Sequence, residues 1–170
     1  MSNPATFLNF AYGSNMLAAR LRERVPSARA IGPAGLARYT LRWHKISKDG
    51  SGKCDVKPDA APGACVWGVI YEIALAEKAA LDQAEGLGNG YEECTVRVAL
   101  PDDSVEVQLY YATKIDAYRV PYDWYKQLVV AGARANELPA DYITTLEATP
   151  SKPDQDTARH RKNAILLARS

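Results

Sequence analysis

The sequence predicts a mixed α+β fold, and three parts of it carry that prediction. Residues 65–73 (CVWGVIYEI) form a nearly continuous apolar run, which is typical of a buried β-strand. Residues 75–84 directly after it have helical periodicity, and Gly86 is placed to end that helix. Two further strand patterns, residues 91–100 and 105–113, are joined by the turn sequence PDDS and predict a β-hairpin.

The N-terminal part predicts a strand, a turn, a helix and a second strand. Residues 6–11 form a short apolar run that suits a buried strand. Along residues 16–25 apolar side chains recur at helical spacing, with arginines on the opposite face. Residues 36–46 alternate apolar and basic side chains, as expected of a strand with one solvated face.

The middle of the chain and its C-terminal part predict a loop, two helices and a tail. Residues 47–63 are rich in Gly, Asp, Lys and Pro and are longer than most connections, so we expect a mobile loop that acts as a lid. Prolines begin the two helices predicted at 121–136 and 139–148. We expect residues 1–150 to form one domain and residues 151–170 a polar tail that is helical and packs on it.

Composition and charge exclude several classes of protein. The 170 residues are 47% hydrophobic with 21 basic and 20 acidic side chains, enough to bury a core but without excess charge to attract nucleic acid. No secretory signal pattern begins the chain, and no stretch reaches the roughly 20 apolar residues of a membrane span. We therefore expect a cytoplasmic protein that binds neither nucleic acid nor membrane.

The cysteines and histidines predict neither disulfides nor a metal site. Cys54, Cys65 and Cys94 are odd in number and lack a C-x-x-C pairing, which indicates reduced thiols. His44 and His160 lie far apart without the spacing of zinc ligands, so we predict no metal. The sequence predicts no particular oligomeric state.

The first predicted strand runs into the sequence YGSNM at residues 12–16, just before the predicted helix. A helix N-terminus has unpaired N–H groups and a partial positive charge, which a capping side chain and a nearby acid usually satisfy. Ser14 or Asn15 can cap, but the first turn MLAA has no acid, so this end stays open to an external anion. Gly13 would let a carboxylate or phosphate approach the backbone. The alternative is that GSN forms an ordinary capped turn.

A second glycine-rich stretch, SKDGSGKC at residues 47–54, tests whether that anion is the phosphate of a nucleotide. A P-loop requires the pattern G-x-x-x-x-G-K-[ST]. Ser47 stands where the first glycine belongs, and Cys54 replaces the hydroxyl residue that holds magnesium. The sequence therefore does not support nucleotide binding.

Glu85 is the residue immediately before Gly86, at the C-terminal end of a predicted helix. An acid in this position costs about 0.3–1 kcal/mol, because the helix dipole is negative there. One explanation is a solvated side chain with Lys78 as its partner. The other is functional, since a helix C-terminus and partial burial both raise the pKa of a carboxyl, which suits a general base that works near neutral pH.

Together, the segments FAYGSNM, KDGSGK, VWGVIYEI, LDQAEGLGNGY and VVAGARANELPADYI resemble the γ-glutamylcyclotransferase family and its bacterial relatives. The resemblance extends over residues 7–148, and the YGSN loop and the glutamate of the EG turn are its most specific parts. It implies a compact, barrel-like mixed sheet flanked by helices. It also implies a cofactor-independent enzyme in which the α-amine of a γ-glutamyl group attacks its own γ-carbonyl, releasing 5-oxoproline and an amine or amino acid.

The resemblance implies roles for individual residues as well. The catalytic acid/base falls on Glu85, acting on a small γ-glutamyl substrate. Tyr91 and Tyr110 correspond to pocket tyrosines of relatives, although Tyr111 lies next to the second and strand tyrosines commonly just pack a sheet. The expected substrate-binding residues are Tyr12, Gly13, Ser14, Asn15, Met16, Tyr91 and Tyr110.

Three alternatives to this function remain open from the sequence. The same chemistry can serve a different leaving group, such as a γ-glutamylamine or a γ-glutamyl-protected natural product, with selectivity expected in residues 47–63 and 118–125. A non-catalytic module that binds a small acidic metabolite would keep the anion-binding loop but has no use for Glu85. A protein-interaction domain is supported only by surface tyrosines and the RHRK sequence of the tail.

Overall fold

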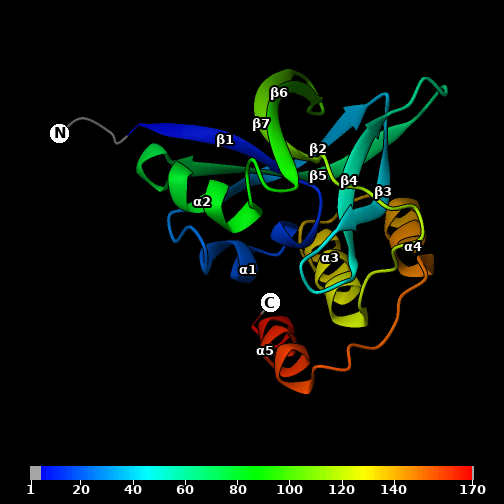
Figure 1. The fold of residues 1–170 in the computed structure, drawn as a ribbon. Helices are drawn as coiled ribbons and strands as arrows, with labels where there is room; N and C mark the ends of the chain where they lie inside the picture. The colour runs from blue at the N-terminus through cyan, green and yellow to red at the C-terminus, as the bar shows by residue number, and fades with distance from the viewer. Residues whose placement is uncertain (1–4, 170) are drawn as a thin grey trace.

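The computed structural model describes residues 5–169 and contains a closed five-stranded barrel (Figure 1). Neighbouring strands are antiparallel except at the closure, where β1 runs parallel to β7 at the pair Asn9 and Gln108. This architecture confirms the mixed α+β, barrel-like fold expected from the sequence. In barrel order the strands are β1 (Thr6–Ala11), β5 (Cys65–Ala74), β2 (Arg29–Ala37), β6 (Tyr91–Ala99) and β7 (Ser104–Ala112).

The strand predicted over residues 36–46 is divided in two. Arg38 has a φ of 64°, a left-handed conformation that reverses the chain between β2 and the next strand, β3 (Tyr39–Ile46). β2 itself begins at Arg29 and pairs along its length with β5, although its sequence RAIGPAGLA has the glycines and proline of a loop. Cross-strand pairing with β5 therefore decides the conformation of this segment.

The prediction of a mobile loop over residues 47–63 is wrong. Residues Gly52–Pro58 form β4, which pairs antiparallel with β3 in a separate two-stranded sheet. This hairpin is held to the barrel by Asp55, whose buried carboxylate accepts hydrogen bonds from the Ala112 backbone N–H at 2.7 Å and from His44 at 2.8 Å. The segment is an ordered wall rather than a free lid.

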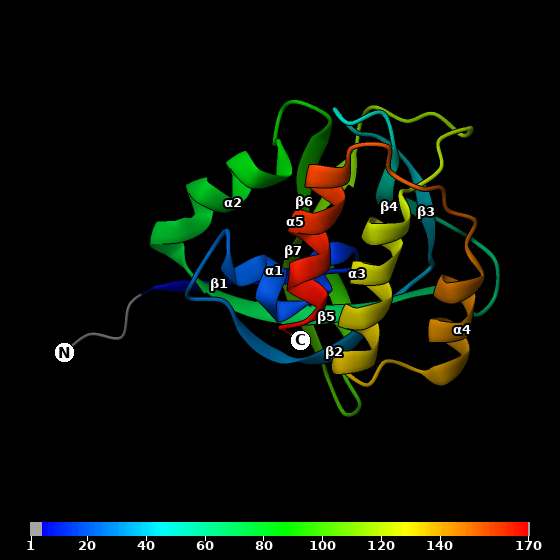
Figure 2. The same cartoon turned by 90° about the horizontal axis from the view of Figure 1, so that it is seen from below.

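The helices gather on one side of the barrel, where α1, α3 and α5 lie close together (Figure 2). α5 packs against α3 and crosses beneath α1. None of the helices in residues 5–169 is long and apolar enough to cross a bilayer. The helical elements are η1 (Ser14–Met16), α1 (Ala18–Arg22), η2 (Leu75–Glu77), α2 (Lys78–Glu85), α3 (Asp123–Ala135), α4 (Ala140–Ala148) and α5 (Thr157–Leu167).

Two helices begin later than the sequence predicts. In place of one helix over 16–25, a 3₁₀ turn is followed by extended Leu17 (φ −78°, ψ 113°) and then by the short α1. α3 starts after Pro121 because Tyr122 is extended (φ −72°, ψ 151°) and pairs with Lys152 of the C-terminal part. At Tyr122, a contact distant in sequence replaces the first helical turn.

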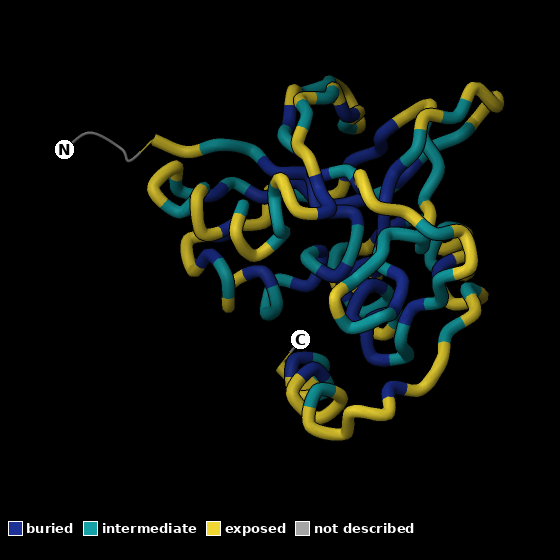
Figure 3. Tube along the Cα trace, viewed as in Figure 1, coloured by how far each residue is buried: buried dark blue, intermediate teal, exposed yellow. Residues whose placement is uncertain are grey.

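The core continues from the barrel strands into the inner face of α3 (Figure 3). Gly132 lies where α3 meets the chain after β1, and a Cβ there would be 2.6 Å from the Leu17 backbone nitrogen and 2.7 Å from the Met16 carbonyl carbon. Met16 itself is 0% exposed. Glycine is needed at this position because two backbones approach each other closely.

We expect Gly132→Ala to lower the free energy of unfolding by about 1–3 kcal/mol, because the added methyl group meets backbone that cannot move aside. Urea denaturation measures this change. Ala135→Ser, an exposed change on the same helix, should stay within about 0.5 kcal/mol of the parent protein. Equal stability of the two variants would contradict the close approach of α3 to the segment after β1.

Candidate functional site

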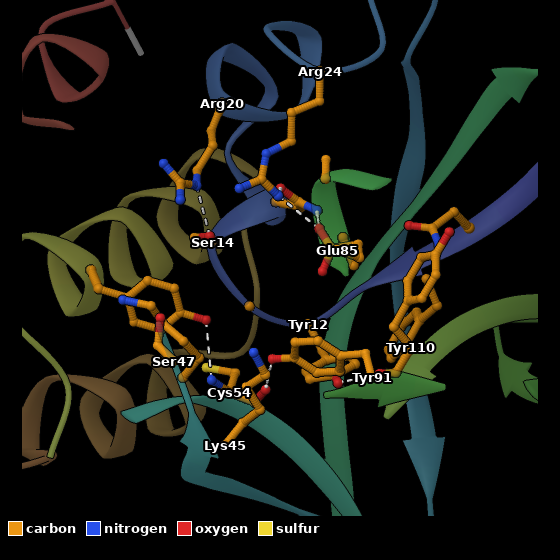
Figure 4. Close-up of a pocket in the computed structure, with 18 of the residues that line it drawn as sticks. Tyr12, Ser14, Arg20, Arg24, Lys45, Ser47, Cys54, Glu85, Tyr91 and Tyr110 are labelled. Atoms are coloured by element: carbon orange, nitrogen blue, oxygen red, sulfur yellow. Dashed lines mark hydrogen bonds and ion pairs between the residues drawn. The ribbon is translucent and has the colours of Figure 1, made fainter. Parts of the chain in front are cut away.

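A cavity of about 270 Å³ opens beside the loop that follows β1. Its walls come from this loop, α1, the β3–β4 hairpin, the end of α2 and the start of α3 (Figure 4). The predicted residues that line it are Tyr12, Gly13, Ser14, Asn15, Glu85, Tyr91 and Tyr110. Met16 is the exception, because its side chain is fully buried in the core and does not reach the cavity.

The loop after β1 presents free backbone donors, although it does not begin an α-helix as expected. Its 3₁₀ turn is closed by the Met16 N–H, which donates to the Gly13 carbonyl at 3.0 Å. Within residues 5–169, the N–H groups of Gly13, Ser14 and Asn15 donate to no protein acceptor. No side chain of the described chain caps the turn. These donors are therefore available to an anion in the cavity.

Gly13 brings this backbone close to the opposite wall. A Cβ at this position would lie 3.1 Å from the Tyr125 hydroxyl oxygen and 3.2 Å from the Cys54 Cβ. Its φ of −114° lies outside the left-handed region, so limited space is what disfavours a side chain here.

Gly13→Ala should therefore raise the KM for an anionic substrate several-fold with little loss of folding stability. The added methyl group pushes on Tyr125 and Cys54 and narrows the approach to the loop. Steady-state kinetics together with a thermal melt measure the two effects. An unchanged KM in a folded variant would show that the substrate does not approach this backbone.

Glu85 ends α2 and points into the cavity, where one of its oxygens is held by two donors (Figure 4). Oε1 accepts a hydrogen bond from Asn15 Nδ2 at 2.6 Å and forms an ion pair with Arg24 Nη1 at 2.7 Å. Oε2 accepts none from the described residues. Gly86 follows in the left-handed conformation (φ 76°) and ends the helix, as the sequence predicts.

Lys78 is not the partner of Glu85. Its ammonium group instead pairs with Asp82 and, at 2.7 Å, with Glu93. Arg24 takes that place, because its guanidinium forms the ion pair with Glu85 Oε1. Asn15 Oδ1 also accepts from Arg24 Nη1 at 3.0 Å, so the loop and the base are tied into one network.

Three tyrosines form the wall beneath Glu85, and their hydroxyl protons are already used. Tyr91 donates to the Cys54 carbonyl at 2.7 Å, Tyr110 donates to Asp82 at 2.6 Å, and Tyr12 donates to the Tyr110 carbonyl. Burial raises the pKa of all three phenols above the usual value, so they stay neutral. Each phenol oxygen keeps a lone pair that can accept a hydrogen bond from a donor group of a ligand.

Arg20 is the main residue of the cavity that the sequence did not predict. Its guanidinium donates from Nε to Ser14 Oγ at 2.9 Å and from Nη1 to Asn163 Oδ1 at 2.8 Å, and it lies 5.8 Å from the centre of the Trp124 ring. It forms no ion pair with any carboxylate in residues 5–169. Burial, together with the nearby Arg24, lowers its pKa to about 10, which leaves it charged at neutral pH.

The β3–β4 hairpin contributes the remaining charged wall. Lys53 pairs with Asp49 at 3.0 Å and lies over the rings of Trp124 and Tyr125, and burial lowers its pKa to about 8. Lys45 lies 4.7 Å above the ring of Tyr91 and has no carboxylate partner within the described chain. In the sequence these lysines look like the solvated face of a strand or loop, so no local signal distinguished them.

Cys54 lines the cavity without being a nucleophile. Burial raises the pKa of its thiol to about 12, which keeps it protonated at neutral pH. The cavity thus contains a carboxylate with one free oxygen, a loop of free N–H donors, and two cations, Arg20 and Lys45, that have no counter-ion among the described residues. Such an arrangement can bind an acidic molecule and move a proton on it.

Comparison with known proteins agrees with this geometry. A model of the AIG2-like family matches residues 65–146. The chain is 32% identical over 149 residues to a Homo sapiens protein named gamma-glutamylcyclotransferase, covering 84% of this chain and 78% of that protein. A Bos taurus protein of the same name matches with 32% identity and the same coverage.

A solved structure named gamma-glutamyl cyclotransferase has the same fold. It superposes with a TM-score of 0.85 at 26% identity, covering 98% of this chain and 100% of that one. The resemblance seen in the sequence is thereby confirmed over most of the chain. By its relatives and its fold, this chain belongs to the γ-glutamylcyclotransferase family.

Proposed function

We propose that this protein converts a γ-glutamyl compound into 5-oxoproline and a free amino acid by intramolecular attack of the α-amine on the γ-carbonyl. The observation that carries this proposal is the position of Glu85 in the cavity, with Oε1 held by Asn15 and Arg24 and Oε2 free of protein partners. The nucleophile belongs to the substrate, so the protonated thiol of Cys54 has no part in the reaction.

Substrate orientation follows from the donors of the loop. The α-carboxylate binds the free N–H groups of Gly13 to Asn15, with the charge of Arg20 beside Ser14. The adjacent α-amine then lies toward Glu85, which Asn15 connects to the same loop. Holding the amine near its own γ-carbonyl removes much of the entropy cost of ring closure.

Glu85 performs both proton steps. Its carboxylate takes a proton from the α-ammonium, which frees the amine lone pair to attack the γ-carbonyl carbon. The C–N bond to the leaving group then breaks as the Glu85 carboxylic acid gives this proton to the departing nitrogen. The ring nitrogen loses its remaining extra proton to water, and the released amine takes one up from water. Arg24 and Asn15 hold one oxygen in place throughout, so only the other needs to change its hydrogen bonds.

The charges of the cavity favour an amino acid as the leaving group over a simple amine. Arg20 and Lys45 both lack a carboxylate partner in the described chain, whereas the γ-glutamyl group has only one carboxylate. A second carboxylate on the leaving group would pair with the second cation.

Cys54, Cys65 and Cys94 are all free thiols, which suits the reducing cytoplasm where we place this activity.

Incubation of the purified protein with γ-glutamyl-alanine tests the proposal, with released 5-oxoproline as the readout. We expect turnover, and a lower kcat/KM for γ-glutamyl-alanine amide, which lacks the second carboxylate. A binding module for acidic metabolites would show thermal stabilisation by the dipeptide without product. That result, or no response at all, would overturn the proposed function.

A further inference from the structure

The C-terminal part of the chain reaches two residues of the cavity wall. From residue 150 it passes around α3 and returns as α5 beneath α1 and α3 (Figure 2). Asp154 and Asn163 on this segment are only 8% and 7% exposed. Asp154 accepts a hydrogen bond from Trp124 Nε1 at 2.8 Å, and Asn163 Oδ1 accepts one from Arg20 Nη1 at 2.8 Å.

The two contacts differ in charge. Asp154 is paired within its own segment, because Arg159 donates to both of its oxygens at 2.6 Å and 2.5 Å. These hydrogen bonds hold the pKa of Asp154 well below its usual range. Asn163 offers Arg20 a neutral acceptor, and its Nδ2 donates to the Arg159 carbonyl at 2.8 Å, which fixes the orientation of the amide. The negative charge of Asp154 is therefore neutralised by Arg159 of the same segment and is not available to the cations of the cavity.

Within residues 5–169, Arg20 is therefore held in place by neutral groups alone. Ser14 Oγ, Asn163 Oδ1 and the Trp124 ring determine where the guanidinium lies, yet none of them neutralises it. A carboxylate in place of Asn163 would hold the arginine at least as firmly. The neutral amide of Asn163 differs from a carboxylate in one respect, because it leaves the charge of Arg20 available to a ligand.

We infer that Asn163 is a positioning residue that aims Arg20 at the substrate carboxylate while leaving its charge uncompensated, so that α5 sets substrate affinity. The inference rests on the proposed function, because it takes the ligand of Arg20 to be a carboxylate of the γ-glutamyl substrate. It assigns a role in substrate binding to a helix whose residues do not line the cavity.

Two substitutions at position 163 separate this role from a structural one. Asn163→Asp and Asn163→Leu are close in size, and both lose the hydrogen bond to the Arg159 carbonyl. Only Asn163→Asp gives Arg20 a protein counter-ion. We expect Asn163→Asp to raise KM for γ-glutamyl-alanine roughly tenfold or more, because it competes with the substrate for a charge-assisted hydrogen bond, with kcat changed far less.

The ranking of the two variants decides the matter. If Asn163 only supported the fold, Asn163→Leu would be the more damaging change, because it leaves an arginine N–H without an acceptor. We expect the reverse, with the KM of Asn163→Asp the higher of the two and circular dichroism showing both to be folded. A KM for Asn163→Leu equal to or above that of Asn163→Asp would overturn the inference.

A double substitution shows whether the effect passes through Arg20. In an Arg20→Gln background, Asn163→Asp should raise KM no further, whereas an additional rise would overturn the inference. Ile165→Ala, on the exposed side of α5, is the control and should keep parental kinetics. An inactive parent protein would overturn the proposed function, while an active parent with unchanged Asn163→Asp kinetics would overturn this inference alone.

Discussion

Glu85→Gln should lower kcat by about 10²- to 10⁴-fold, which is the contribution typical of a general acid–base group. The amide oxygen of glutamine can still accept the hydrogen bonds that Asn15 and Arg24 now donate to Oε1. What is lost is the free carboxylate oxygen that takes the proton of the α-ammonium. Initial rates of 5-oxoproline release from γ-glutamyl-alanine measure the effect.

Glu92→Gln is the matched control for this prediction. Glu92 is an exposed residue of β6, so the same chemical change there alters the net charge without touching the cavity. Its kcat should equal that of the parent protein. A folded Glu85→Gln variant with parental kcat would remove Glu85 from the mechanism.

Arg20→Gln should raise KM by roughly 10- to 150-fold, because a hydrogen bond to a charged group contributes about 1.5–3 kcal/mol and each 1.4 kcal/mol is tenfold. The guanidinium is held beside the free N–H groups of the loop by its hydrogen bond to Ser14 Oγ. The change removes this charge but not the base, so kcat should fall much less than KM rises. Substrate-saturation curves separate the two constants.

Arg22→Gln controls for the loss of one positive charge from the same helix. Arg22 is exposed and donates to the Ala28 carbonyl, outside the cavity. Parental KM is expected for this variant. If Arg22→Gln and Arg20→Gln raised KM equally, the effect would be one of overall charge, and Arg20 would have no direct contact with the substrate.

The segments whose structure the sequence predicted correctly are those with a strong local pattern. The apolar run of β5, the PDDS hairpin of β6 and β7, and the glycine stop after α2 all have the expected form. Each depends on side-chain periodicity or turn chemistry within a few residues. Glu85 and the YGSN loop were also identified, and the fold brings both to one cavity.

The segments that local pattern misjudged are those whose partners lie far away in the sequence. β2 has two glycines and Pro33, yet it is a strand because it pairs with β5 over residues 29–37. Pro33 is tolerated because β2 meets β6 only at Gly35, so its outer edge is largely unpaired there. β4 likewise becomes a strand through β3, and the expected loop contributes Lys53 and Cys54 to the cavity wall.

The sequence by itself determined β5, the β6–β7 hairpin and the glycine stop after α2, because apolar periodicity and turn residues act locally, and it singled out the YGSN loop and Glu85 as a candidate site. Only the tertiary structure decided which cations join them. Arg20, Lys45, Trp124 and Asn163 are separated by at least 20 residues along the chain and meet through barrel closure and the packing of α3 and α5. Such proximity results from many weak contacts summed over the whole fold, and no spacing along a single chain encodes it.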